Sequence, residues 1–137
     1  MAEKHTAYKR KLQKHLYFSH MLSCAELSTL TNKSLPFTTR LLNELVADGI
    51  VVETGYANST GGRRPQIYSL KADLTYIITV AVDQLVTRMA IMDLHNNLVG
   101  TVERFDLPLR NNPCALDQLT EHRIQFIDQS GIEQSHL

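Results

Sequence analysis

The chain has 137 residues, of which 43% are apolar and 20% are charged, so it is long enough for one ordinary domain or two small ones and is not of the disordered class. No apolar run is long enough to span a bilayer, and the first residues lack the apolar segment of a signal peptide. Two cysteines, Cys24 and Cys114, form neither a disulfide framework nor a CxxC metal pair. These features together predict a protein of the reducing cytoplasm with no membrane partner.

The formal net charge is zero, but the charges are unevenly distributed along the chain. Residues 1–70 carry nine Lys or Arg against five Asp or Glu, whereas residues 71–137 carry five against nine. A basic half joined to an acidic half favours contact between a polyanion and the first half only. Because a difference of this size also arises from chance clustering, it supports a polyanionic partner without identifying one.

The first predicted element is a helix over residues 4–19, with Leu12 and Leu16 one turn apart on its inner side. Much of the remaining surface of this helix is basic, and its cations are Lys9, Arg10, Lys11 and Lys14. A single basic run is more often a solvated face than a phosphate-binding one, so this helix alone does not identify a partner.

A short second helix is predicted to follow a capping box. Ser23 accepts a hydrogen bond from the first turn, and Glu26, three residues later, reaches back to the Ser23 backbone. Leu27 and Leu30 are expected to point inward. Residues 31–33 then form a tight turn before the next helix, which completes a helix-turn-helix.

The stretch from Ser34 to Asp48 is predicted to be the helix around which the chain is organised. Its apolar face consists of Thr38, Leu41, Leu42 and Leu45, which recur at helical spacing. Ser34 is expected to cap the first turn, and Gly49 follows the last turn, where a left-handed residue is favoured. The opposite face is polar with one cation, and it collects Pro36, Arg40 and Asn43, flanked by Phe37 and Thr39. Judged alone, such a helix is more often an ordinary amphipathic surface helix, but after a short helix and a tight turn it suits the major groove of DNA.

Two β-prone runs, residues 50–54 and 66–70, are predicted to form a hairpin directly after this helix. The loop between them, residues 55–65, reads GYANSTGGRRP and carries Arg63 and Arg64 at its far end. A hairpin in this place is a wing, whose arginines typically enter the narrow minor groove. The alternative is a surface hairpin with solvated arginines.

Beyond residue 71 the pattern changes to three strands joined by hairpins. They are expected over residues 76–82, 86–94 and 98–105. Asn112 is then expected to cap a helix that has Pro113 at its first position and ends at Gly131. The inward residues of that helix are predicted to be Leu116, Leu119, Ile124 and Ile127. One helix covers such a sheet only in part, so we expect this region to be incomplete or completed by another chain.

The sequence from Ser23 to Leu70 resembles the N-terminal winged helix of the ROK family, which comprises repressors, open reading frames and sugar kinases. The motifs that carry the resemblance are residues 23–27, residues 34–40 and the GGRRP run at residues 61–65. Residues 76–100 resemble the first hairpin of that family's actin-like, ribonuclease-H-like sugar-kinase domain. The resemblance covers nearly the whole chain.

This resemblance implies an α+β chain, with a winged helix-turn-helix DNA-binding domain at residues 1–72 and a partial effector domain, the first ββ(β)α portion of the sugar-kinase fold, at residues 73–137. The function implied is a sequence-specific repressor of carbohydrate-metabolism genes that binds double-stranded operator DNA as a homodimer. A sugar or sugar phosphate would act only through a missing C-terminal region. The predicted DNA-binding residues are Lys33, Ser34, Pro36, Phe37, Thr39, Arg40, Asn43, Arg63 and Arg64.

The chain departs from sugar-kinase members at the turn between Asp83 and Thr87, where no glycine allows close approach of phosphates. We therefore expect no enzymatic activity and no cofactor, and the family's zinc and sugar residues have no counterpart here. The six histidines show no metal-ligand spacing. The alternatives are a ROK-type sugar kinase, against which the missing glycines argue, and a winged helix that serves only protein contacts, against which the basic first half argues.

Overall fold

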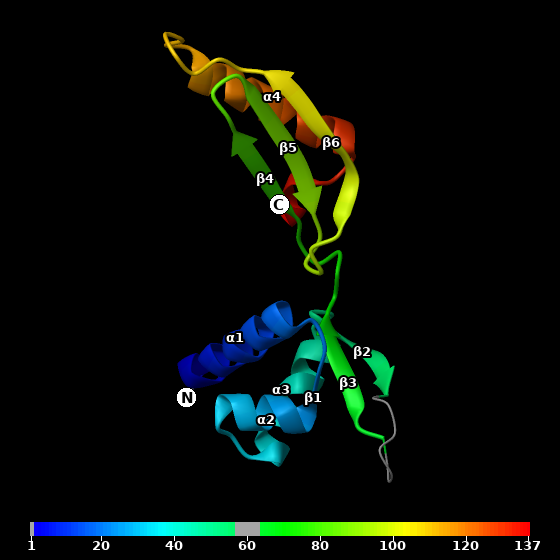
Figure 1. Cartoon of the computed structure of the whole chain (residues 1–137). Coiled ribbons are helices and arrows are strands. Elements are labelled where there is room, and N and C mark those ends of the chain that lie inside the picture. Colours follow the sequence, from blue (N-terminus) through cyan, green and yellow to red (C-terminus); the bar gives the residue numbers. More distant parts are fainter. Residues whose placement is uncertain (1, 57–63) are drawn as a thin grey trace. The chain divides into compact units, whose positions relative to one another are not determined.

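The computed structural model describes residues 2–56 and 64–137, which divide into two compact units, Met1–Ala72 and Asp73–Leu137 (Figure 1). The elements of the first unit are α1 (Ala2–Ser19), β1 (Leu22–Ser23), α2 (Cys24–Thr31), α3 (Leu35–Ala47), β2 (Val51–Tyr56) and β3 (Gln66–Leu70). Those of the second unit are β4 (Ile77–Val82), β5 (Val86–Met92), β6 (Leu98–Asp106), α4 (Ala115–Ser130) and the short 3-10 helix η1 (Gln134–His136). The expected combination of helices and antiparallel sheets is confirmed. No helix in the described ranges is long and apolar enough to cross a bilayer.

The first unit packs three helices beside a small antiparallel sheet in the order β1-β3-β2 (Figure 1). Its core is made mainly of leucines from all three helices: Leu12, Leu16, Leu27, Leu41, Leu42 and Leu45 are each at most 1% exposed. Thr38 is equally buried, so the predicted apolar face of α3 is confirmed. Leu30, however, is 50% exposed, and its predicted burial is wrong. The neighbouring Thr31 is half-buried and lines a small pocket together with Leu12 and Leu41.

The hydrogen bonds at the helix ends set the turn between α2 and α3. Ser23 caps α2 and forms the predicted capping box with Glu26. Asn32 ends α2 in the left-handed conformation, with φ of 51°, and the Lys33 N–H donates to the Ser28 carbonyl over 3.0 Å. Ser34 occupies the N-cap of α3, but its side chain makes no capping hydrogen bond, so that prediction is wrong. A capping side chain accepts from the second or third residue of the helix, and the second residue here is Pro36, which has no N–H.

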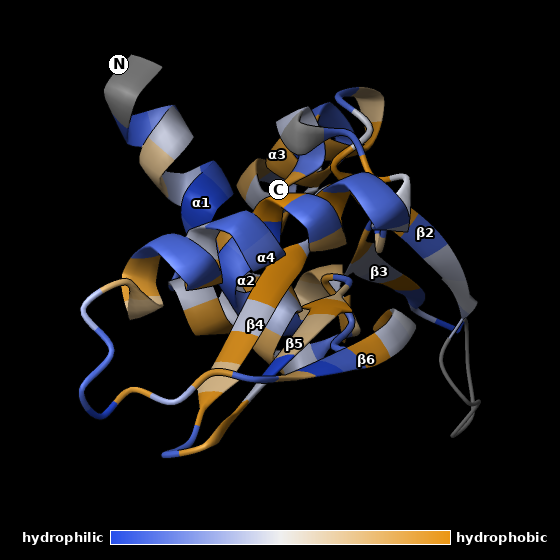
Figure 2. Cartoon of the chain, turned by 90° about the horizontal axis from the view of Figure 1, so that it is seen from above, coloured by the Kyte–Doolittle hydropathy of each residue, from blue (hydrophilic) through white to orange (hydrophobic). Residues whose placement is uncertain are grey.

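The second unit is an antiparallel sheet in the order β4-β5-β6 with α4 against one face (Figure 1). Met89, Ile91 and Phe126 form its core, and Figure 2 shows the apolar character of β4. The helix begins at Ala115 with Cys114 as its N-cap, later than predicted, because the Asn112 carboxamide instead accepts from the Cys114 N–H in a turn.

The predicted inner face of α4 is right in part. Ile127 is 5% exposed and Leu119 is partly buried, but Leu116 is 73% and Ile124 43% exposed. Side chains on a helix lean toward its N-terminus, so Leu116 in the first turn points past the start of the helix. Ile124 lies two residues before Phe126, the buried residue that the sequence analysis missed, and so does not share its side of the helix. Together with Ile127 it lines an open pocket beside Ile78 of β4.

Candidate nucleic-acid interface

The exposed face of α3 presents four of the predicted DNA-binding residues to solvent. Pro36, Thr39, Arg40 and Asn43 are all exposed, while the buried face of the same helix holds it against the core. Pro36 lies in the first turn, where its missing N–H costs no helical hydrogen bond. The helix is therefore fixed from behind and accessible along its N-terminal half.

Arg40 is less free than its exposed position suggests. Its guanidinium Nη2 lies 3.2 Å from Nε2 of His5, which comes from α1. Its Cζ lies 5.4 Å from the centroid of the Phe37 ring, within the range of a cation–π contact. The Glu44 carboxylate, one turn further along α3, lies 4.0 Å from Nε. With 56% of its side chain exposed, Arg40 is oriented by these contacts and still open to a partner.

Thr39 has a hydroxyl that is already used. It donates to the Leu35 carbonyl over 2.9 Å, which leaves its oxygen to accept from the Cys24 thiol at 3.2 Å. Such a threonine presents mainly its methyl group to a partner, and apolar contact with a thymine methyl is one way of reading the major groove. Asn43 is exposed two turns after Pro36 on the same helix.

Phe37 is half-buried and is the centre of an aromatic cluster between α1 and α3. The His5 and Tyr8 rings each meet the Phe37 ring edge to face, with centroids 5.6 Å apart. Such pairs are favourable beyond the area they bury. Phe37, predicted as a DNA-binding residue, therefore has a structural role in seating the start of α1 on α3.

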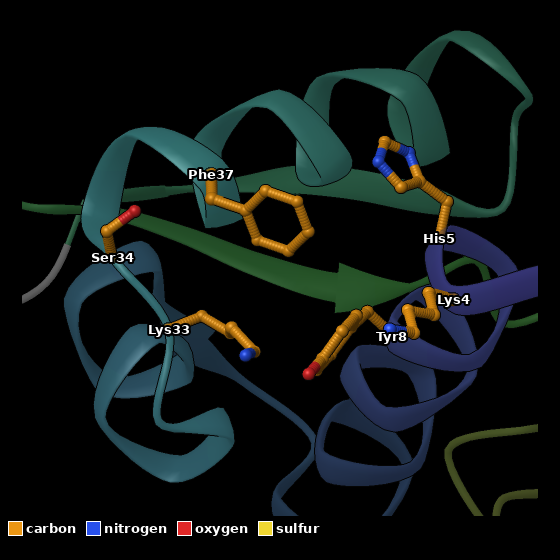
Figure 3. A pocket seen from close by; sticks show the side chains of 6 residues that line it. All are labelled: Lys4, His5, Tyr8, Lys33, Ser34 and Phe37. Carbon is orange, nitrogen blue, oxygen red and sulfur yellow. The ribbon is translucent and has the colours of Figure 1, made fainter. Parts of the chain in front are cut away.

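Lys33 and Ser34, from the turn before α3, lie beside this cluster. The Lys33 ammonium is 4.5 Å from the centroid of the Tyr8 ring. In Figure 3 it is turned toward the Tyr8 hydroxyl. The hydrogen bond from Lys33, followed by the charges of Lys33, Lys11 and Lys4, holds the pKa of Tyr8 below its ordinary value against the opposing effect of burial. The lowered pKa indicates a positive electrostatic environment around this hydroxyl.

A pocket of about 460 Å³ opens at this point. Its lining residues are Lys4, His5, Tyr8, Lys33, Ser34 and Phe37, which come from the start of α1 and from the turn and first residues of α3 (Figure 3). The sequence analysis predicted Lys33, Ser34 and Phe37 but missed the three residues of α1. The spacing of Lys4 and Tyr8, one helical turn apart, puts them on one face of α1, but only the packing of α1 on α3 brings that face to Ser34.

The other cations of α1 differ in what they contact. The Lys9 ammonium bridges Glu44 of α3 at 3.1 Å and Asp48, the C-cap of α3, at 3.0 Å, and its hydrogen bonds to Asp48 and then Glu44 raise its pKa. Lys9 is thus paired within the protein, while Arg10, Lys11 and Lys14 are exposed. The basic run predicted from sequence therefore contains one structural lysine and three solvent-facing cations.

The β2–β3 hairpin carries the remaining predicted residues. Arg64 is exposed two residues before the start of β3, while Arg63 lies outside the described residues. The two strands pair antiparallel from Val51 with Leu70 to Tyr56 with Gln66, with a register shift between Glu53 and Gly55. Among the residues for which coordinates are described, no group of three or more His, Cys, Asp or Glu could hold a metal ion.

Comparison with known proteins gives both a sequence and a fold relationship. The chain matches no protein-family profile. It is 35% identical over 60 residues to the xylose repressor of Caldicellulosiruptor bescii, an alignment that covers 44% of this chain and 15% of that repressor. A crystal structure of a ROK-family transcriptional regulator, a homologue of the E. coli MLC protein, superimposes with a TM-score of 0.59 at 12% identity.

That superposition covers 91% of this chain and 32% of the regulator, so the chain spans about a third of that protein's length and 15% of the xylose repressor's. At 12% identity the structural match establishes a shared fold, and the repressor match adds a direct sequence relationship to part of the chain. Together they confirm the resemblance to ROK-family transcriptional regulators that the sequence indicated.

Proposed function

We propose that the first unit, residues 1–72, is a winged helix-turn-helix that binds operator DNA, and that the chain acts in a repressor of carbohydrate-metabolism genes. The observation that carries this proposal is that α3 has one buried face and one exposed polar face. One face is buried on leucines, and the other presents Arg40 from its second turn and Asn43 from its third turn to solvent. In a helix-turn-helix, the N-terminal residues of the second helix contact base edges in the major groove.

The roles within the interface follow from the chemistry of each side chain. A guanidinium at Arg40 can pair with O6 and N7 of a guanine, and the amide of Asn43 with N6 and N7 of an adenine. Arg64, on the hairpin that serves as the wing, is suited to phosphates or to a narrow minor groove. The similarity to the xylose repressor supports a carbohydrate context for the genes controlled.

The second unit, residues 73–137, is in this proposal a portion of the actin-like effector domain. Its three-stranded antiparallel sheet with one covering helix is compatible with the first ββ(β)α portion of a sugar-kinase fold. Binding of two half-sites by a homodimer, control by a sugar or sugar phosphate and a cytoplasmic location are further parts of the proposal. We also propose that the chain is not an enzyme.

The test is selection of bound sequences by the full chain from a pool of random duplex DNA, followed by affinity measurements over a series of salt concentrations. Enrichment of a defined sequence, with an affinity that falls steeply as salt rises, is the expected result. An unenriched pool or a flat salt dependence contradicts the proposal and leaves contact with another protein as the better account of the exposed face of α3.

A further inference from the structure

The pocket between α1 and α3 contains a set of hydrogen-bond donors that base reading does not use. Lys4 and Lys33 supply ammonium groups, and Tyr8 and Ser34 supply hydroxyls. The Ser34 hydroxyl is not used to cap α3. Among the lining residues that the structure describes, none is a carboxylate, so none of them neutralises the two lysines.

The acidic residues at the C-terminal end of α3, one in the helix and one at its C-cap, are already paired with a lysine. Glu44 and Asp48 are both paired with Lys9, and neither lines the pocket. The charges of Lys4, Lys11 and Lys33 all act on the Tyr8 hydroxyl and contribute to its lowered pKa. The pocket is therefore a region of positive potential. The ion pairs that Lys9 of α1 forms with Glu44 and Asp48 lie outside it.

The rigid wall and the volume of the pocket indicate which anionic group it can bind. Edge-to-face contacts of Phe37 with His5 and Tyr8 hold the aromatic walls in place, so the donors are presented from a fixed frame. Ammonium and hydroxyl groups are common partners of phosphate oxygens in protein–DNA complexes, and such contacts fix the position of the protein on the duplex. A volume of about 460 Å³ accommodates one phosphodiester group with its solvent.

We propose that this pocket binds a single backbone phosphate of the operator, with Lys4 and Tyr8 of α1 joining Lys33 and Ser34 as its ligands. The inference rests on the proposed function, and it adds a contact from α1 that the sequence analysis did not include. Its role is to fix how far α3 enters the groove, because the pocket opens beside the first residue before that helix. Base choice remains with the exposed face of α3.

The experiment uses the full chain and a duplex obtained by selection. Affinities are measured over a salt series for wild type, Lys4→Ala, Tyr8→Phe and the control Lys14→Ala, which removes the same charge about 15 Å further along α1. Each protein is also tested on duplexes in which one phosphate at a time is replaced by a neutral methylphosphonate. Thermal unfolding of each variant checks that the first unit is intact.

We expect Lys4→Ala to reduce the slope of log affinity against log salt by about one, and Lys14→Ala to reduce it less. Tyr8→Phe should weaken binding by about 3- to 10-fold, because it removes a hydroxyl and keeps the ring. One methylphosphonate position should weaken wild type and have no further effect on Lys4→Ala. A different outcome is that wild type binds DNA while every methylphosphonate substitution weakens Lys4→Ala as much as it weakens wild type. In that case the pocket proposal is wrong and the proposed function stands. If wild type binds no DNA, both are wrong.

Discussion

The guanidinium of Arg40 donates to Nε2 of His5 across 3.2 Å, which links the exposed face of α3 to the first turns of α1. An arginine has no acceptor, so in this contact the guanidinium is the donor and the imidazole nitrogen is the acceptor. Arg40 is thereby held over the Phe37 ring before any partner arrives. A base-reading side chain that is oriented in advance loses less conformational entropy on binding.

Arg40→Ala is the first prediction. Loss of a bidentate contact with guanine should weaken binding to the preferred site by about 1–3 kcal/mol and relax the base preference at one position of each half-site. The measurement is affinity for a panel of duplexes with single-base changes. The matched control is Arg64→Ala, which should weaken binding to most sequences and flatten the salt dependence. The roles are reversed if Arg40→Ala lowers all affinities equally and Arg64→Ala alone loses discrimination.

The contact between His5 and Arg40 yields a second prediction. If His5 orients Arg40, then His5→Ala should weaken binding to the preferred duplex in wild type and have little further effect in an Arg40→Ala background. The comparison of the two single variants with the double variant measures this coupling. Strictly additive effects would mean that His5 acts independently of Arg40, for example through its edge-to-face contact with Phe37.

The third prediction concerns the capping box of α2. Ser23→Ala should reduce the free energy of unfolding of the first unit by about 1 kcal/mol, because the first turn of α2 loses its cap. The Ser23 side chain and then its backbone N–H donate to Glu26 and lower the pKa of that carboxyl. A lowered pKa in the folded state means stability that is present above the ordinary carboxyl pKa and lost as the pH falls through the folded value.

Denaturant titrations at about pH 7 and about pH 3 measure both effects. The difference between wild type and Ser23→Ala should be larger at the higher pH. Ser23→Thr is the control, because threonine keeps the hydroxyl and should retain most of the stability. An equal loss at both pH values would show that the carboxylate of Glu26 contributes nothing through this bond.

Lys9 is predicted to matter for stability and not for DNA. Lys9→Ala should lower the melting temperature of the first unit, because Glu44 and Asp48 lose their shared cation. Its effect on the slope of DNA affinity against salt should be smaller than that of Lys33→Ala. Lys14→Ala, an exposed lysine of the same helix, serves as the stability control. The same melting temperature in both variants would show that the ion pairs of Lys9 are energetically neutral.

The fifth prediction is that the chain does not bind ATP. In the turn after β4, the Asp83 carboxylate already accepts from the Gln84 N–H at 2.6 Å, and the Asp83 N–H donates to the Val86 carbonyl. Leu85, 70% exposed, occupies a position at which a phosphate-binding turn needs glycine. Calorimetry with Mg-ATP should therefore give no heat of binding. A micromolar site that disappears in Asp83→Asn would show that this turn binds phosphate after all.

The elements that the sequence predicted best are those defined by period and by capping chemistry. Four residues at helical spacing identified the buried face of α3, and the pair Ser23 and Glu26 identified the start of α2. The predictions of helix ends were wrong where one side chain could form either of two local hydrogen bonds. Asn112 could cap a helix or close a turn, and it closes a turn three residues before the first residue of α4.

Much of the candidate interface could not be predicted, because it depends on how α1 packs. The sequence gives Arg40 an exposed place on a helix, but it does not bring His5 to its guanidinium from 35 positions away. Lys9 and Lys14 look alike in a basic run, and only the approach of α3 pairs one of them with two carboxylates. Contacts between segments that are far apart in the sequence leave no repeating pattern of residues. They could therefore be identified only in the folded unit.

The left-handed residue at the end of α2 has a consequence for the substitutions that this region tolerates. Asn32 has a φ of 51°, a conformation that asparagine, aspartate and glycine adopt far more easily than other residues. A β-branched residue there would either strain the backbone or open the turn that sets α3 at its angle to α2. Among natural variants of this chain, position 32 should therefore drift only between glycine and short polar residues, even though its side chain is exposed and contributes nothing to the core.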